Sequence, residues 1–339
     1  MFPSEPVIGY PGPTPTGAEP EAIATALSYP ANDNIFPLVA SPISGDAPSN
    51  FSLTQNWGNL SPWYTVNSSF YGLPKASPLL PAGSDCEITQ VHYLYRHGAR
   101  YPTTGSFNSF NQKLANATAK GGFNASGPLT FLNTWTYKLG AELLTPFGRL
   151  QNFELGVEAR QLYGHLLNNF TAQGTIPVFR TESQDRMVKT ANNFAAGFFG
   201  VPEYLDEVNI QIIVEAGGFN NTGAPYYTCK NSNIASRGSI GSTVAAEYAA
   251  TAFASTATRI NSYVTGDLNF TASDMVPMLQ LCAYETDALG SSAFCSLFTS
   301  KDFANFEYYY DLSFYYNNGA GSPVSPFILL HTFTSSTSS

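Results

Sequence analysis

The stretch Arg96-His97-Gly98-Ala99-Arg100-Tyr101-Pro102 places two arginines and a histidine within five residues, directly after the apolar run 88–95. Arginine is scarce in this chain, which has eight. Four of them lie in this stretch and in a second one, 179–186, which reads Phe-Arg-Thr-Glu-Ser-Gln-Asp-Arg. In a chain of net charge -9, such clustering around one histidine indicates an anion pocket. Phosphate is the natural ligand, because a planar guanidinium meets it with paired, charge-assisted hydrogen bonds.

A neutral imidazole beside a bound phosphate can attack phosphorus and form a phosphohistidine, which divides one hard displacement into two easier ones. Arginines around the phosphate would offset the charge of its oxygens, and phosphoryl transfer depends mostly on such stabilisation. Release of an alcohol needs one further group, an acid that protonates the leaving oxygen.

The alternative for a bare Arg-His-Gly triplet is a structural histidine held by hydrogen bonds. The full pattern Arg-His-Gly-x-Arg-x-Pro fixes five positions, and it would arise by chance in roughly one in ten thousand chains of this length. The longer pattern therefore favours the phosphate pocket over the structural alternative.

Both segments resemble the histidine acid phosphatases, most closely their fungal phytase branch. Further similar stretches are 129–140, 144–148, 281–286 and 319–323. The resemblance implies that His97 is the nucleophile and that Arg96, Arg100 and Arg180 bind the phosphate. It also implies that Thr103 and Arg186 hold these groups in position without binding the phosphate themselves.

The fold implied by this resemblance is an α/β domain of phosphoglycerate-mutase type. It has a mixed sheet with helices on both faces and an inserted α-helical domain. We expect a Pro-rich disordered leader over 1–50, the phosphatase domain over 51–323 and an aberrant Ser/Thr-rich tail over 324–339. Within that domain, the α/β core is expected at about 84–105 and 145–225, and the helical insert at about 106–144 and 226–318.

The apolar and turn-forming residues predict the individual elements. Strands are expected over 88–95, 176–181 and 208–214. Helices are expected from Thr145-Pro146 to about residue 168, from Asp185 to Gly200, and over about 241–263 and 273–289. The histidine loop would follow the first strand at its carboxyl end, where open α/β sheets bind ligands.

One family feature is missing. The family's third motif is a His-Asp pair whose aspartate acts as the general acid, and no His-Asp dipeptide occurs in this chain. We therefore expect the C-terminal part of the fold to be missing.

Charged residues make up 12% of the chain, and its polarity comes instead from Asn, Ser, Thr and Tyr, as is common in extracellular glycoproteins. No run is long and apolar enough for a membrane helix. The negative charge argues against nucleic-acid binding. No signal peptide is visible, but eight Asn-x-Ser/Thr triplets predict glycosylation. Their asparagines are Asn50, Asn59, Asn67, Asn116, Asn124, Asn169, Asn220 and Asn269.

The four cysteines fit neither a zinc site nor a Cys-x-x-Cys redox site. Cys282 and Cys295 resemble a cysteine pair of the family, which implies a disulfide between them. Cys86 and Cys229 resemble family cysteines whose partners lie in the missing part, so we expect them to be unpaired. The alternative is four reduced thiols in a cytosolic protein.

These observations together predict a secreted, monomeric acid phosphatase. It would hydrolyse phosphate monoesters such as myo-inositol hexakisphosphate (phytate), with no metal or organic cofactor and no membrane or nucleic-acid partner. Two alternatives within the superfamily are a cytosolic mutase and a broad-specificity sugar phosphatase. An alternative from another class is a catalytically impaired glycoprotein that binds phosphate.

Overall fold

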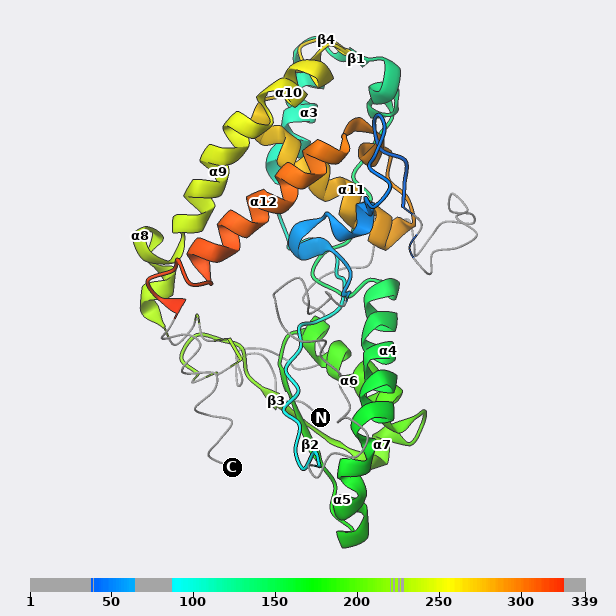
Figure 1. The fold of residues 1–339 in the computed structure, drawn as a ribbon. Coiled ribbons are helices and arrows are strands. Elements are labelled where there is room, and N and C mark those ends of the chain that lie inside the picture. The colour runs from blue at the N-terminus through cyan, green and yellow to red at the C-terminus, as the bar shows by residue number, and fades with distance from the viewer. Residues whose placement is uncertain are drawn as a thin grey trace. The chain divides into compact units, whose positions relative to one another are not determined.

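The computed structural model describes residues 38, 40–64, 87–219, 221, 223, 224, 226 and 229–325. The chain divides into two compact units, whose elements are labelled in Figure 1. The described residues of unit 1 are 63, 64, 87–100 and 144–215, and the other described residues form unit 2. Most of the expected leader and most of the tail lie outside the described residues.

Unit 1 combines helices with a two-stranded parallel sheet. Its elements are α4 (Pro146–Tyr163), η5 (Gly164–Leu167), α5 (Asn168–Gln173), β2 (Val178–Glu182), α6 (Asp185–Phe199), α7 (Tyr204–Glu207) and β3 (Asn209–Ile213). In the sheet, Arg180 lies opposite Gln211 and Glu182 lies opposite Ile213. The strands expected over 176–181 and 208–214 are therefore confirmed, with boundaries shifted by one or two residues.

Helices α4 and α6 pack closely against each other. A Cβ atom at Gly156 of α4 would lie only 2.1 Å from the carbonyl oxygen of Phe194, so glycine is required at this contact. Around it, Ala159, Phe194 and Phe198 form a small buried core. This packing fixes the position of the start of α4, on which the histidine loop rests.

The prediction of a strand over 88–95 is wrong. Residues 87–98 form no ladder hydrogen bonds, and β2 and β3 pair only with each other among the described residues. Tyr95 stacks on Phe194, with 4.8 Å between the ring centroids. A run of β-forming residues becomes a strand only when a second strand supplies hydrogen-bond partners, and this run has none in the described part.

The helix expected to begin at Thr145-Pro146 is confirmed, but it is interrupted earlier than expected. Helix α4 ends at Tyr163, and the 3-10 segment η5 and the short helix α5 follow it. Gly174, with φ +63°, adopts the left-handed conformation that ends α5.

Unit 2 is mostly helical. Its helices are η1 (Leu53–Gln55), η2 (Gly58–Leu60), α3 (Asn108–Lys120), η4 (Gly127–Asn133), η7 (Lys230–Asn233), α8 (Ala235–Gly238), α9 (Ile240–Ala252), α10 (Ala254–Asn261), η8 (Ala272–Asp274), α11 (Met275–Leu289), η9 (Ala293–Leu297) and α12 (Ser300–Asn317). One antiparallel pair joins β1 (Phe123–Ala125) to β4 (Val264–Gly266). The helix expected over 241–263 is two helices, α9 and α10, and the helix expected over 273–289 is α11.

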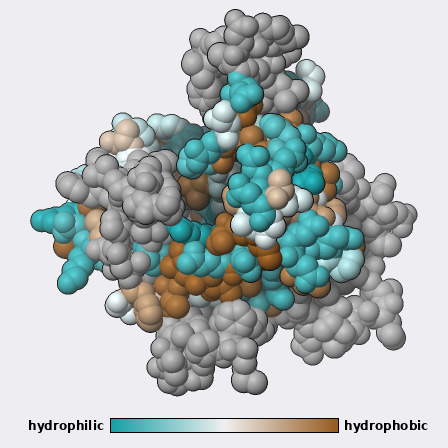
Figure 2. Space-filling view, turned by 90° about the horizontal axis from the view of Figure 1, so that it is seen from below, coloured by the Kyte–Doolittle hydropathy of each residue, from teal (hydrophilic) through white to brown (hydrophobic). Residues whose placement is uncertain are grey.

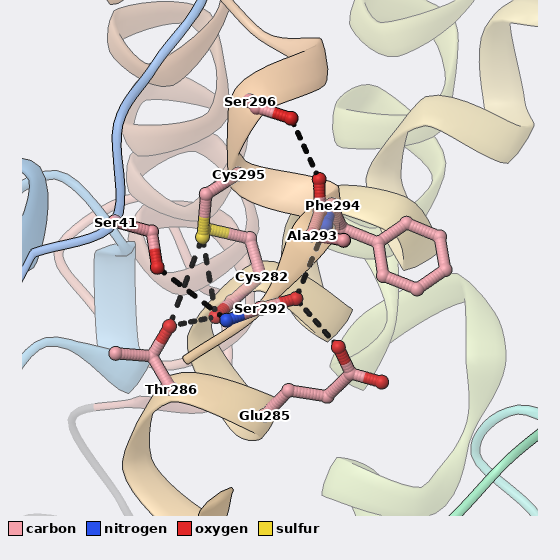
Figure 3. The surroundings of a disulfide bond; sticks show 9 residues. All are labelled: Ser41, Cys282, Glu285, Thr286, Ser292, Ala293, Phe294, Cys295 and Ser296. Carbon is pink, nitrogen blue, oxygen red and sulfur yellow. Dashed lines mark hydrogen bonds between the residues drawn. A yellow bond between two sulfur atoms is a disulfide. The ribbon is translucent and has the colours of Figure 1, made fainter. Parts of the chain in front are cut away.

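The core of unit 2 surrounds α11, which is buried along most of its length. Cys282 of α11 and Cys295 of η9 form the expected disulfide. Figure 3 shows polar groups beside it, among them Ser292, which donates a hydrogen bond of 2.6 Å to Glu285. The other carboxyl oxygen of Glu285 accepts a hydrogen bond of 2.9 Å from Trp135. Cys229 is a free thiol, and Cys86 lies outside the described residues.

Not all apolar surface is covered. Among the described residues of unit 1, Leu94 is 80% exposed and Val201 is 68% exposed, and Figure 2 shows hydrophobic surface on the face that it views. Among the described residues, no helix has both the length and the apolar character needed to cross a membrane.

Candidate active site

The loop that contains His97 is fastened to the first turn of α4. Thr145 is the N-cap residue of α4: its hydroxyl accepts a hydrogen bond of 3.0 Å from the Gly148 amide. The amide of Thr145 donates to the Ala99 carbonyl at 3.0 Å, and the Ala99 amide donates to Gln151 at 2.8 Å. Both backbone groups of Ala99 are thereby held by α4.

The loop and the helix also touch without intervening side chains. A Cβ atom at Gly148 would lie 1.9 Å from the Ala99 carbonyl oxygen, and one at Gly98 would lie 2.2 Å from the Gly148 carbonyl oxygen. Asn152, which is buried, donates to that Gly148 oxygen at 2.7 Å. Two glycines are therefore required for the close approach that positions the histidine.

The side chain of His97 has a defined orientation and tautomer. Its Nδ1 lies 2.8 Å from the Gly98 carbonyl oxygen. A carbonyl can only accept a hydrogen bond, so Nδ1 carries the proton and donates it. In the neutral ring this leaves the lone pair on Nε2, which is the nitrogen that could attack an electrophile.

The pKa of His97 is lowered to about 3. Burial is the largest cause and the positive charges of Arg96, Arg100 and Arg186 act in the same direction, whereas the Gly98 hydrogen bond opposes them. Charging the imidazole is unfavourable both because water is largely excluded and because cationic groups act on it. The ring therefore stays neutral in moderately acidic solution.

The second arginine segment joins the carboxyl end of β2 to the start of α6. Arg180 is on the exposed side of β2, and its Nε donates a hydrogen bond of 2.8 Å to Gln211, its neighbour on β3. At the end of the strand, the buried Ser183 hydroxyl accepts from the Glu215 amide at 2.9 Å. Helix α6 then begins with Asp185 and Arg186.

The structure brings some of the predicted residues together. Arg96, Arg100 and Arg186 act electrostatically on His97, whereas the contact of Arg180 given above is with Gln211. Thr103 belongs to unit 2, where its hydroxyl lies 2.6 Å from that of Ser106. Arg186, which the sequence suggested only as a supporting residue, is thus among the arginines whose charges reach the histidine.

The residues that fix the loop were not singled out as site residues by the sequence. Thr145, Gln151 and Asn152 contact the loop or the glycine beneath it, and they do so through ordinary caps and amide hydrogen bonds. A signal existed for Thr145 and Gly148, because the stretch 144–148 is one of those that resemble the phosphatases.

The sequons fall into three groups by their placement. Asn50, Asn116, Asn124, Asn169 and Asn269 are exposed. Asn59 is half-buried, with its side-chain oxygen buried. Asn67 and Asn220 lie outside the described residues.

Comparison with known proteins shows the family to which the chain belongs. Phytase A of Aspergillus fumigatus is 31% identical over 282 residues, which cover 80% of this chain and 57% of that protein. A thiamine-repressible acid phosphatase of Schizosaccharomyces pombe is 32% identical over 299 residues, 83% of this chain and 60% of that protein. The chain thus spans about three fifths of the length of these relatives.

A solved structure and a family model also match the chain, and they show its fold and family. The crystal structure of the phytase from D. castellii is similar with a TM-score of 0.57 and 28% identity, over 72% of this chain and 55% of that one. The fold is therefore the mixed α/β fold of the histidine phosphatases, here mostly helical. The model of the histidine phosphatase superfamily, branch 2, matches residues 87–337, which include His97 and all the arginines discussed above. This chain belongs to the histidine phosphatase superfamily, branch 2.

Proposed function

We propose that the protein is an acid phosphatase that hydrolyses phosphate monoesters through a phosphohistidine on His97. The observation that carries this proposal is the state of His97: its Nδ1 donates to the Gly98 carbonyl, the lone pair lies on Nε2, and the charges of three arginines act on the ring. A neutral, oriented imidazole under the influence of cationic groups is suited to attack on a phosphate dianion or monoanion.

In the proposed first step, Nε2 of His97 attacks phosphorus, a P–N bond forms and the ester P–O bond breaks. The leaving alkoxide takes a proton from an acid, and Asp185 and Glu182 are the candidates for this acid in this sequence. In the second step water attacks phosphorus, the P–N bond breaks and phosphate leaves. Arg96, Arg100 and Arg180 are the proposed phosphate ligands, with Thr103 and Arg186 in support.

The proposed substrate class includes phytate, because several relatives are named Phytase A. The low pKa of His97 supports activity at acidic pH, since the nucleophile stays unprotonated there. Secretion is proposed from the disulfide, which persists in oxidising compartments, and from the exposed sequons.

A second candidate function is binding of phosphate without turnover, which applies if no group replaces the His-Asp pair that this sequence does not contain. Loss of a positioned general acid costs about 10² to 10⁴ in rate. The cost is greatest for alkoxide leaving groups and smallest for para-nitrophenolate, so the two substrate types separate the candidates. A protein that only binds phosphate releases none from either substrate.

The test of the function is phosphate release from para-nitrophenyl phosphate and from phytate at acidic pH. His97→Asn should lower the rate by about 10³-fold or more, as expected for loss of a nucleophile. His165→Asn is the matched control, because His165 is an exposed histidine of η5 in the same unit. Equal rates for parent and His97→Asn would contradict the proposal, and no turnover by the parent, with tungstate still bound, would favour the second candidate.

A further inference from the structure

Unit 2 has a groove between α3 and the loop that follows β4, with a volume of about 690 Å³ and a lining of mostly polar residues. One wall is the exposed face of α3, which presents Asn108, Gln112, Lys113 and Lys120. The other wall includes Asp267. Amides, ammonium groups and a carboxylate are the hydrogen-bonding partners that suit a ligand rich in hydroxyl groups.

Two sequon asparagines line this same groove. Asn116 is on α3 and Asn269 is in the loop after β4, and both are exposed. Asn116 accepts a hydrogen bond of 2.8 Å from Gln112 through its side-chain oxygen. The amide nitrogen of Asn116, the atom to which a glycan would be attached, takes no part in this hydrogen bond.

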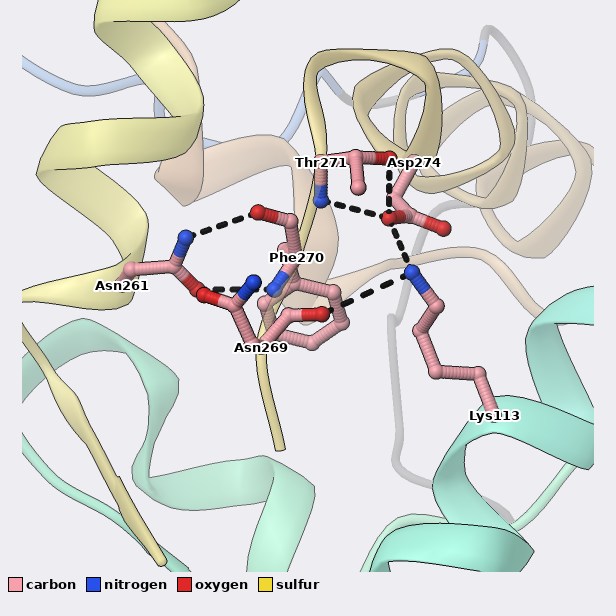
Figure 4. Close-up of polar contacts among 6 residues, drawn as sticks. All are labelled: Lys113, Asn261, Asn269, Phe270, Thr271 and Asp274. Carbon is pink, nitrogen blue, oxygen red and sulfur yellow. Dashed lines mark hydrogen bonds and ion pairs between the residues drawn. The ribbon is translucent and has the colours of Figure 1, made fainter. Parts of the chain in front are cut away.

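The backbone around Asn269 is held firmly, as Figure 4 shows. Lys113 forms an ion pair with Asp274, and its ammonium group also donates to the Asn269 carbonyl at 3.5 Å. On the next residue, the backbone groups of buried Phe270 are bound by the side chain of Asn261 at 2.7 and 2.8 Å. The loop therefore has a fixed course while the side chain of Asn269 remains exposed at the groove.

Asn59 provides the contrast. Its side-chain oxygen is buried, and the preceding Gly58 packs against the ring of Tyr310 so closely that a Cβ atom would lie 2.2 Å from it. The Asn59 side chain is thus partly enclosed, and a glycan on it would have to be accommodated beside this close contact.

We propose that Asn116 and Asn269 both carry N-linked glycans, and that the innermost sugars of the two glycans share the groove between α3 and the loop after β4. In each transfer, the amide nitrogen forms a bond to the first sugar carbon of a lipid-pyrophosphate-linked oligosaccharide. The carbon–oxygen bond to the pyrophosphate breaks, and the amide loses one proton. This inference rests on the secretory part of the proposed function and not on the proposed catalysis.

The first test maps occupied sites on the full chain secreted from a yeast host behind a fused signal sequence. Peptides treated with a glycan-removing amidase in ¹⁸O-water gain heavy oxygen only where a glycan was attached. The label is expected at Asn116 and Asn269 and not at Asn59. No label at Asn116 or at Asn269, or a label at Asn59, overturns the proposal. Phosphatase activity is assayed on the same sample, so its absence with both sites labelled counts against the catalytic proposal alone.

The second test asks whether the sugars occupy the groove. Lys120 lines it, and Lys301 of α12 is an exposed lysine of the same unit that does not. Acetylation of Lys120 by an amine-reactive ester should be several-fold faster in the Asn116→Gln/Asn269→Gln variant than in the glycosylated parent, with Lys301 unchanged. Equal rates at Lys120 would show that the glycans extend away from the groove. If the double variant does not fold, the folded parent from which the amidase has removed the whole glycans provides the comparison.

Discussion

At the scale of single residues, two buried titratable groups dominate the behaviour of the protein. Burial and neighbouring arginines keep His97 neutral. Asp287 of α11 is buried in unit 2, and its Oδ1 has no hydrogen-bond partner within the described part of the chain. The first group is suited to nucleophilic chemistry. The second lowers the stability of the fold and has no role in the proposed reaction.

We predict that His97 makes the protein less stable in acid. The folded-state pKa of about 3 is below the ordinary value of 6.5, so between these values the unfolded chain binds a proton that the folded chain does not. The free energy of unfolding therefore falls as the pH drops from about 6.5 to about 3.

The measurement is the free energy of unfolding against pH for the parent and for His97→Asn. Relative to the parent, the variant should become more stable as the pH is lowered through this range. His165→Asn is the control and should follow the parent curve. If His97→Asn also followed it, the inferred pKa of the histidine would be incorrect.

We predict the opposite pH dependence for Asp287. Burial raises the pKa of this carboxyl well above its ordinary value, so the folded state holds the proton more tightly than the unfolded state. Its contribution to stability is present below the unfolded-state pKa and is lost as the pH rises through the folded-state pKa. Asp287→Asn should therefore stabilise the protein at neutral pH, by about 1–3 kcal/mol, and have little effect in acid.

Denaturant unfolding at two pH values measures this effect. Asp46→Asn, at an exposed position, controls for the change of net charge. Destabilisation by Asp287→Asn at neutral pH would mean that the carboxylate has a partner that stabilises its charged form.

At the scale of elements, the sequence predicts local features well and pairing poorly. Thr145-Pro146 specifies the start of α4 through a cap and a first-turn proline, and α6 begins at Asp185 as expected. The run 88–95 has the composition of a strand, but a ladder depends on a partner far away in the sequence. The site follows the same rule: the motif points to His97, and the resemblance of 144–148 marks Gly148, but the fold is needed to show the contact between Gly148 and the histidine loop.

We predict that Gly148→Ala disables the site without unfolding the chain. The added Cβ would meet the Ala99 carbonyl at 1.9 Å, so the histidine loop must shift away from α4. Overpacking of this kind costs about 1–3 kcal/mol of stability. A displacement of the nucleophile should lower kcat/KM by about 10²-fold.

The comparison is with Gly217→Ala, where an added Cβ meets nothing within 4 Å. Kinetics with para-nitrophenyl phosphate and thermal unfolding are measured for both variants. Full activity in Gly148→Ala would show that the loop does not depend on the close contact with α4.

At the scale of the whole molecule, the chain consists of two units with different means of stabilisation. Unit 1 has a small core and relies on the close packing of α4 against α6, whereas unit 2 has a large core crossed by one disulfide. The family resemblance predicted that disulfide from sequence. The contacts between the aromatic side chains and α11 were beyond prediction, because they join segments distant in the chain.

We predict that the disulfide contributes about 3 kcal/mol to stability, since it closes a loop with a sequence separation of 13 residues. The Cys282→Ala/Cys295→Ala variant should unfold at correspondingly lower denaturant concentration. Cys229→Ala removes the free thiol and serves as the control, with little change expected. An unchanged midpoint for the double variant would show that packing around α11 suffices without the bond.

The most direct test of the central claim is to trap the phosphoenzyme. The protein is mixed with a ³²P-labelled phosphate monoester, quenched in alkali, where phosphohistidine survives, and digested to locate the label. We predict label on His97 that mild acid removes, in the parent and in His165→Asn but not in His97→Asn. Label on another residue, or phosphate release with no trapped label and with equal rates in His97→Asn, would contradict the account.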